Sequence, residues 1–158
     1  MTTINGKACI VNGVPVDKVF SDGKQVYGRN LLLDTSNELK TVTRSGWGKS
    51  PTNLASGTYG AGRYYASAYV ENTTHVGVAI FVSIYTGGKF LHNLSAKPIP
   101  VGQSGVVSFT FDIYNEQVID SAFVGFVSSQ TESYTYKYKE MMLTRTPSPW
   151  TPAPEDYI

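Results

Sequence analysis

The sequence has a single cysteine, Cys9, so no disulfide can form within the chain. The fold therefore does not depend on an oxidising compartment. The first residues are polar and interrupted by glycine, and they lack the pattern of a signal peptide. The longest apolar run, residues 76–85, is too short to cross a bilayer. We therefore expect no membrane contact. A role outside the cell that makes the protein would require lysis or assembly into a particle.

Charge is also scarce. Only 16% of the residues are charged, and the formal net charge of the 158 residues is +1. A balanced chain of this kind lacks the basic surface of a nucleic-acid-binding protein. No segment has a convincing amphipathic helical pattern, and residues 116–121 would form one turn at most. Short alternating segments between Gly and Pro turns predict instead an all-β fold, a two-sheet antiparallel β-sandwich or jelly roll.

The chain is expected to have two parts. Residues 1–28 contain Asn-Gly and Asp-Gly turns and predict an N-terminal β-hairpin extension. A lone hairpin is marginal in water, so we expect it to serve attachment or oligomerisation. Residues 29–158 form the sandwich domain. Its first strand is expected at 29–36, and a long loop is expected at 46–62.

Residues 62–85 are interpreted as a central β-hairpin. In its first limb an aliphatic and aromatic set alternates with Arg63, Tyr65, Ser67 and Tyr69. In its second limb branched aliphatic residues alternate with a set that includes Phe81 and Tyr85. The period of two places each set on one face of a sheet. The aromatic and small-polar face is either a functional surface or the contact with a second sheet.

Catalytic patterns are missing. Gly48–Ser50 has the ending of a phosphate-binding loop but not its upstream glycine, and His75 and His92 lack metal-ligand spacing. Asp112 and Glu140 could in principle form a glycosidase pair, but such carboxylates are far more often structural. We predict that the protein is not an enzyme.

Aromatic residues are plentiful, with 11 tyrosines. An aromatic ring stacks on the apolar face of a sugar, while Asn, Arg, Ser and Tyr side chains bond its hydroxyls. The predicted saccharide-binding residues are Trp47, Tyr65, Tyr69, Tyr85, Tyr134, Tyr136, Arg63 and Asn53. Phe81, Tyr138 and Tyr59 are further candidates. Each of these aromatics has an alternative role in packing.

Two stretches carry a resemblance, VDKVFSDGKQVYGRNLLLDTS at residues 16–36 and YKYKEMMLTRTPSPWTPAPEDY at residues 136–157. They resemble the carbohydrate-binding modules in tail and baseplate proteins of phages that infect Gram-positive bacteria, especially lactobacilli. The segment GRYYASAYVENT is similar to a strand of these modules, so the resemblance extends over residues 16–158. Its end motifs are specific, whereas its middle is only jelly-roll-like.

The resemblance implies a jelly roll that binds host cell-wall saccharides as part of a virion adhesion device, with other tail proteins and further copies of the chain as partners. It also implies a structural calcium near the first and last strands, for which Glu140 would supply a carboxylate. No other cofactor is expected. Such modules usually decorate longer proteins, so a stand-alone accessory protein and an excised piece both stay open. The alternative function is a purely structural tail or head-decoration protein that acts through protein contacts.

Overall fold

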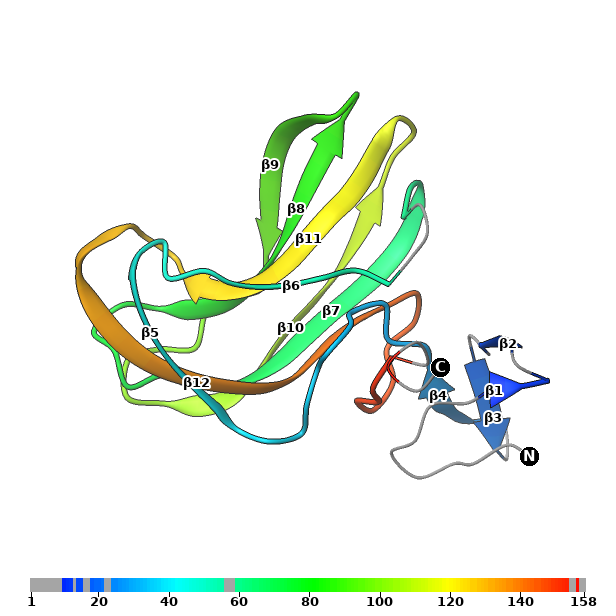
Figure 1. Ribbon diagram of the computed structural model, residues 1–158, viewed down its shortest axis with the longest axis horizontal. Coiled ribbons are helices and arrows are strands. Elements are labelled where there is room, and N and C mark those ends of the chain that lie inside the picture. The colour runs from blue at the N-terminus through cyan, green and yellow to red at the C-terminus, as the bar shows by residue number, and fades with distance from the viewer. Residues whose placement is uncertain are drawn as a thin grey trace.

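The computed structural model describes residues 10–12, 14–15, 18–21, 24–55, 59–153 and 156. At the N-terminal end, β1 (Ile10–Val11) pairs with β2 (Val14–Pro15), and β3 (Lys18–Ser21) pairs with β4 (Lys24–Gly28). The antiparallel β3–β4 pair confirms the predicted hairpin. These four strands lie at one end of the molecule, beside the main sheets (Figure 1). The division into an attachment hairpin and a binding domain stays a prediction.

Two four-stranded antiparallel sheets form the main body, which is a β-sandwich as predicted. The first sheet has the order β10-β7-β12-β5, with β10 at Ser104–Ile113, β7 at Gly62–Glu71, β12 at Gln130–Thr144 and β5 at Lys40–Gly46. The second has the order β6-β11-β8-β9, with β6 at Ser50–Thr52, β11 at Gln117–Phe126, β8 at Val78–Thr86 and β9 at Lys89–Ser95. No helix among the described residues could cross a membrane.

The core lies between the sheets and follows the alternation of the strands. On β7 the buried set is Tyr64, Ala66, Ala68 and Val70, and on β8 it is Val78, Ile80, Val82 and Ile84. Because alternate residues point to opposite faces, the intervening side chains lie on the outer surfaces of the sandwich. Burial of each large aliphatic side chain contributes about 1.5 to 3 kcal/mol.

The prediction of a central hairpin is wrong, although both of its limbs are strands. β7 and β8 belong to different sheets, and residues 72–77 carry the chain across the sandwich. Asn72 organises this crossing, since its buried Nδ2 donates to the backbone oxygens of Val76 and Ile99 at 2.9 and 3.0 Å. The two outer faces therefore point in opposite directions and do not form one aromatic surface.

Two other segments differ from expectation. Residues 29–36 form no strand beyond an isolated bridge between Leu32 and Leu54, although Leu31 and Leu32 are buried. The expected loop at 46–62 contains the three-residue strand β6. The backbone bonds of residues 29–36 are single ones, such as those from Leu31 to Leu143 and from Leu33 to Asn53, and they form no regular ladder. A sequence pattern indicates burial more reliably than it indicates strand pairing.

Candidate functional site

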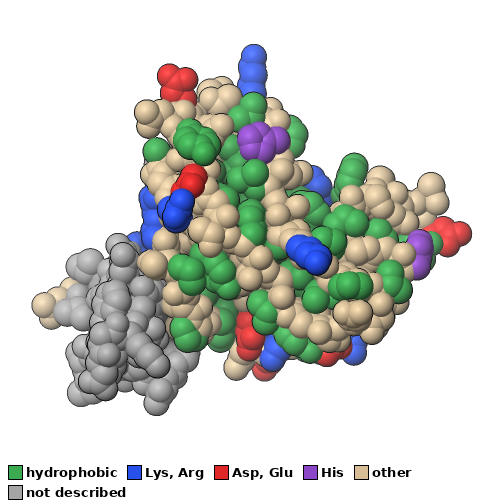
Figure 2. Space-filling model, turned by 180° about the vertical axis from the view of Figure 1, so that it is seen from behind, with side chains coloured by type: hydrophobic (Ala, Val, Ile, Leu, Met, Phe, Trp, Pro, Cys, Tyr) green, Lys and Arg blue, Asp and Glu red, His purple; other side chains and the backbone are tan. Residues whose placement is uncertain are grey.

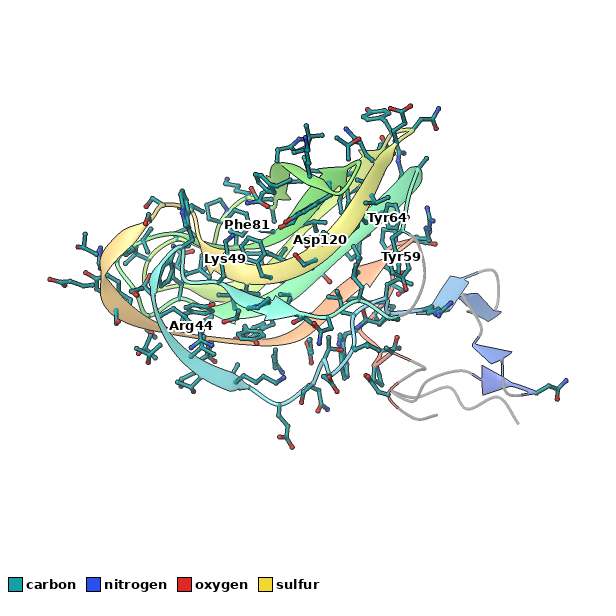
Figure 3. All side chains as sticks on the ribbon, turned by 45° about the horizontal axis from the view of Figure 1, so that its top comes forward. Arg44, Lys49, Tyr59, Tyr64, Phe81 and Asp120 are labelled. Atoms are coloured by element: carbon teal, nitrogen blue, oxygen red, sulfur yellow. The ribbon has the colours of Figure 1, made fainter. Side chains whose placement is uncertain are left out.

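A cleft of about 310 Å³ opens on the outer face of the β6-β11-β8-β9 sheet. Its lining is mainly aromatic and has two polar members, Lys49 and Asn93; the aromatic residues are Trp47, Phe81, Phe90, Phe123 and Phe126. Lys49 and Phe81 lie close together in Figure 3. We call this feature the aromatic cleft. Charged side chains are few and scattered on the face of the molecule seen in Figure 2.

Cross-strand pairing builds the floor of the aromatic cleft. Phe81 of β8 lies opposite Phe123 of β11, and their rings stack with centroids 5.0 Å apart and planes 7° from parallel. Phe123 is only 4% exposed, whereas Phe81 is partly open to solvent. Lys49 extends over Phe123, with Nζ 4.9 Å from the ring centroid. The result is a flat apolar platform with an ammonium group at its edge.

Trp47 stands at the rim, 53% exposed, on a tight turn between β5 and β6. The amide of Gly48 donates to the Ser45 oxygen at 3.0 Å, and Gly46 and Gly48 have φ values of +59° and +60°. A Cβ atom at Gly48 would lie 2.4 Å from the Phe126 ring, so only glycine fits there. The Trp47 oxygen also accepts a bond from the Phe126 amide at 2.8 Å. These contacts fix the backbone of the turn that carries Trp47.

Tyr136 supports this turn from below. It is fully buried, and its hydroxyl lies 2.6 Å from the Gly48 oxygen, 2.8 Å from Ser50 Oγ and 3.1 Å from the Val124 oxygen. Because a phenol has one proton, it donates to a carbonyl and accepts from Ser50. Burial raises the pKa of Tyr136 to about 12. Tyr136 therefore positions the Trp47 turn and is not itself a surface for a ligand.

We expect Tyr136→Phe to weaken the alkaline sensitivity of folding. The ordinary tyrosine pKa is 10.0, and burial raises the folded value to about 12. The stabilisation by the neutral phenol is thus complete below pH 10 and is lost as the pH rises through about 12, a change of about 3 kcal/mol. The variant should lose about 1 kcal/mol at pH 8 and show a shallower decline above pH 10. Urea unfolding between pH 8 and 11.5 measures both effects. The exposed Tyr114→Phe is the control, and equal slopes for all three proteins would contradict the assignment.

The structure separates the predicted saccharide-binding residues. Trp47 lines the aromatic cleft, and Tyr85 lies at its end, with its ring edge-on to Phe90 at 5.8 Å. Tyr65 and Tyr69 lie on the outer face of the opposite sheet. Arg63 also lies there and forms a bidentate pair with Asp112 at 2.9 and 3.0 Å. Eight residues that were expected in one site thus occupy several.

The remaining predicted residues lie away from both outer faces. Tyr136 is a core residue, and its predicted stacking on a sugar does not agree with its complete burial. Tyr134 is half-buried, in edge-on contact with His75 at 4.0 Å, and its hydroxyl donates to Glu132 at 2.9 Å. Asn53 lines a separate shallow hollow with Asp34 and Lys40.

Sequence reasoning missed five members of the aromatic cleft, namely Lys49, Phe90, Asn93, Phe123 and Phe126. The period of two places Phe123 on the face opposite to Ala122, Val124 and Phe126, although residues 122–126 are all buried. No signal links Lys49 to Asn93, since only the sheet order brings their segments together.

The described residues do not fit the implied calcium. No group of three or more His, Cys, Asp or Glu side chains among them could hold a metal. Glu140 Oε1 lies 3.4 Å from Lys139 Nζ, and the Glu140 amide donates to the Ser36 oxygen at 2.7 Å. Where residue 30 meets the last strand, Asn30 Nδ2 donates to the oxygens of Met141 and Thr151 at 2.9 and 3.0 Å. The side-chain amide of Asn30 therefore occupies the position between these carbonyl oxygens that a calcium ion would need.

The possible glycosidase pair is not supported either. Asp112 of β10 and Glu140 of β12 flank β7 on opposite sides, and the positions of β7 beside them are about five residues apart. This spacing corresponds to roughly 17 Å, beyond the reach of a catalytic pair. The hydrogen bond from Arg63 lowers the pKa of Asp112, whereas a general acid needs a raised pKa.

No protein-family model matches the sequence, and comparison with curated proteins finds no match. Among solved structures, the tripod from the baseplate of bacteriophage Tuc2009 has a TM-score of 0.47 at 14% identity; the match covers 81% of this chain and 59% of that one. A mutant of a family 29 carbohydrate-binding module has a TM-score of 0.42 at 13% identity, over 99% and 96% of the two chains. A chain from the structure of infectious bursal disease virus, Gt strain, has a TM-score of 0.43 at 12% identity; the match covers 84% of this chain and 38% of that one. Likenesses this distant do not define a function.

Proposed function

We propose that the protein binds host cell-wall saccharides without catalysis, as part of a phage virion adhesion device. The aromatic cleft carries this proposal. A sugar ring would stack on Phe81 and Trp47 through its apolar face. Phe81 and Trp47 leave part of their rings open to solvent, although Phe123 and Phe126 beneath them are buried. The virion context rests on the sequence resemblance of residues 16–36 and 136–157.

Polar groups around the platform suit a saccharide. Asn93 Oδ1 accepts a hydrogen bond from Ser83 Oγ at 2.8 Å, which fixes the orientation of the amide. Asn93 Nδ2 has no hydrogen-bond partner within the described part of the chain, so it remains able to donate to a sugar hydroxyl. Lys49 supplies a second donor at the platform's edge. A shallow platform with few donors predicts weak single-site binding that many copies on one virion would strengthen.

The direct test is binding to intact cells of candidate Gram-positive hosts. A fluorescent, multimerised form of the full chain should label cells of a host strain, and wall polysaccharide extracted from that strain should compete. Addition of the polysaccharide should also change the tryptophan emission, because Trp47 is half exposed at the platform. Absence of labelling and of any fluorescence change on all strains would reject saccharide binding and favour a structural role in the virion.

A further inference from the structure

The aromatic cleft has an uneven charge. Lys49 is the only charged side chain in its lining, and the lining contains no carboxylate. Asp120, the nearest acidic residue along β11, lies at a bulge between Ile119 and Ser121 and does not line the cleft. Arg44 Nε donates to the backbone oxygen of Lys49 at 3.3 Å, but Arg44 does not line the cleft. The one charge in the lining is therefore the positive charge of Lys49.

The Lys49 ammonium group is not neutralised. Across the part of the chain that the structure describes, no carboxylate lies within ion-pair distance of its Nζ. Its one recorded contact is with the Phe123 ring at 4.9 Å, which leaves the donors free. The exposed ion pairs of this chain lie elsewhere; an example is Lys137 with Glu71 at 3.7 Å.

The opposite sheet provides a contrast. A hollow of about 340 Å³ there is lined by Tyr69, Lys139 and two carboxylates, those of Glu71 and Glu140. Lys139 Nζ lies 3.4 Å from Glu140 Oε1 and 5.3 Å from the Tyr69 ring. Its cation is therefore already compensated. An anion entering this hollow would meet two carboxylates, whereas in the aromatic cleft it would meet only the ammonium of Lys49.

We propose that the saccharide bound in the aromatic cleft carries an anionic group, a uronate carboxylate or a phosphodiester, and that Lys49 binds this group. The inference rests on the proposed function and specifies its ligand. The sugar ring would lie on Phe81 and Trp47, and the anion at the platform's edge would receive a charge-assisted hydrogen bond from Nζ. A neutral saccharide would leave Lys49 without a partner.

The test uses wall polysaccharide from a labelled host in three forms: native, treated with hydrogen fluoride to remove phosphodiesters, and reduced at its carboxyl groups. Lys49→Met keeps the apolar stem, Lys49→Arg keeps the charge, and Lys137→Met on the opposite sheet is the matched control. We expect Lys49→Met to bind the native form about tenfold more weakly and the other two variants to stay within about threefold. One of the two treatments of the polysaccharide should weaken its binding to the native protein by a similar factor and leave its binding to Lys49→Met unchanged.

The outcomes are distinguishable. Loss on hydrogen fluoride treatment identifies a phosphodiester, and loss on reduction identifies a uronate. Equal binding of all three forms, with Lys49→Met unchanged, would overturn the anionic ligand and leave saccharide binding intact. Failure of the native protein to bind any form would overturn the proposed function and, with it, this inference.

Discussion

Asn30→Leu should destabilise the protein by about 3 to 5 kcal/mol. Asn30 is fully buried, and the two N–H groups of its Nδ2 are shared among three acceptors at 2.9 to 3.0 Å, namely Thr35 Oγ1 and the oxygens of Met141 and Thr151. Its Oδ1 accepts from the amides of Leu32 and Leu143, each at 3.1 Å. Leucine has a similar volume but would satisfy none of these groups, and each buried polar group that loses its partner costs about 1 to 3 kcal/mol. Urea unfolding at pH 7 measures the loss.

Asn30→Asp separates the role of the amide from that of side-chain volume. The carboxylate would still accept from the two amides, but its second oxygen would lie against the carbonyl oxygens of Met141 and Thr151, which cannot donate to it. Its pKa should be raised, so the variant should gain stability as the pH falls and the carboxyl group regains a proton. Exposed Asn53→Asp is the matched control and should stay within about 0.5 kcal/mol of the native protein. Loss of stability by less than 1 kcal/mol in Asn30→Leu would show that the network is dispensable.

The Asn30 network shows one limit of sequence reasoning. The pattern identified residues 29–36 as apolar and therefore buried, which Leu31 and Leu32 confirm. It predicted a strand, because buried apolar residues usually join a ladder. In the structure the Asn30 side chain bonds to the last strand and to residue 151, and single backbone bonds link Leu31 to Leu143 and Ser36 to Glu140 without forming a continuous ladder. Contacts across more than one hundred residues leave no local pattern.

The fold class followed from local patterns, whereas the pairing did not. The alternation of residues 106–113 in the sequence matches β10, in which Val107, Phe111 and Ile113 are buried. Alternation could not decide whether β7 and β8 pair with each other, because two strands that face one core from opposite sheets show the same alternation as a hairpin. That ambiguity placed Tyr65 and Tyr69 on the same predicted surface as Phe81.

The tyrosines of β12 were assigned to the surface for a related reason. Tyr134, Tyr136 and Tyr138 alternate with Thr135, Lys137 and Lys139, and the lysines indicate which face meets solvent. A tyrosine has an apolar ring and a polar tip, so its presence alone does not decide between core and surface. Tyr136 can be buried because its hydroxyl donates to the Gly48 oxygen inside the sandwich.

Trp47→Ala should reduce saccharide affinity at least thirtyfold, which corresponds to about 2 kcal/mol. The indole is half exposed at the platform's rim, and its turn is held by the Phe126 amide and the Tyr136 hydroxyl through backbone atoms. Because those bonds do not involve the indole, unfolding stability should change by less than about 0.5 kcal/mol. Titration with host wall polysaccharide and urea unfolding measure the two quantities.

Tyr69→Ala tests the opposite face with a matched aromatic deletion. Tyr69 lies on the outer surface of the first sheet, so its loss should leave saccharide affinity within about twofold of the native value. The tryptophan emission should still respond to polysaccharide in Tyr69→Ala but not in Trp47→Ala, since Trp150 is partly buried and hydrogen-bonded to the Met141 oxygen. The reverse result, with Tyr69→Ala impaired and Trp47→Ala normal, would move the site to the first sheet. Only a site in the aromatic cleft makes binding depend on Trp47 and not on Tyr69, because the sandwich core separates the two side chains.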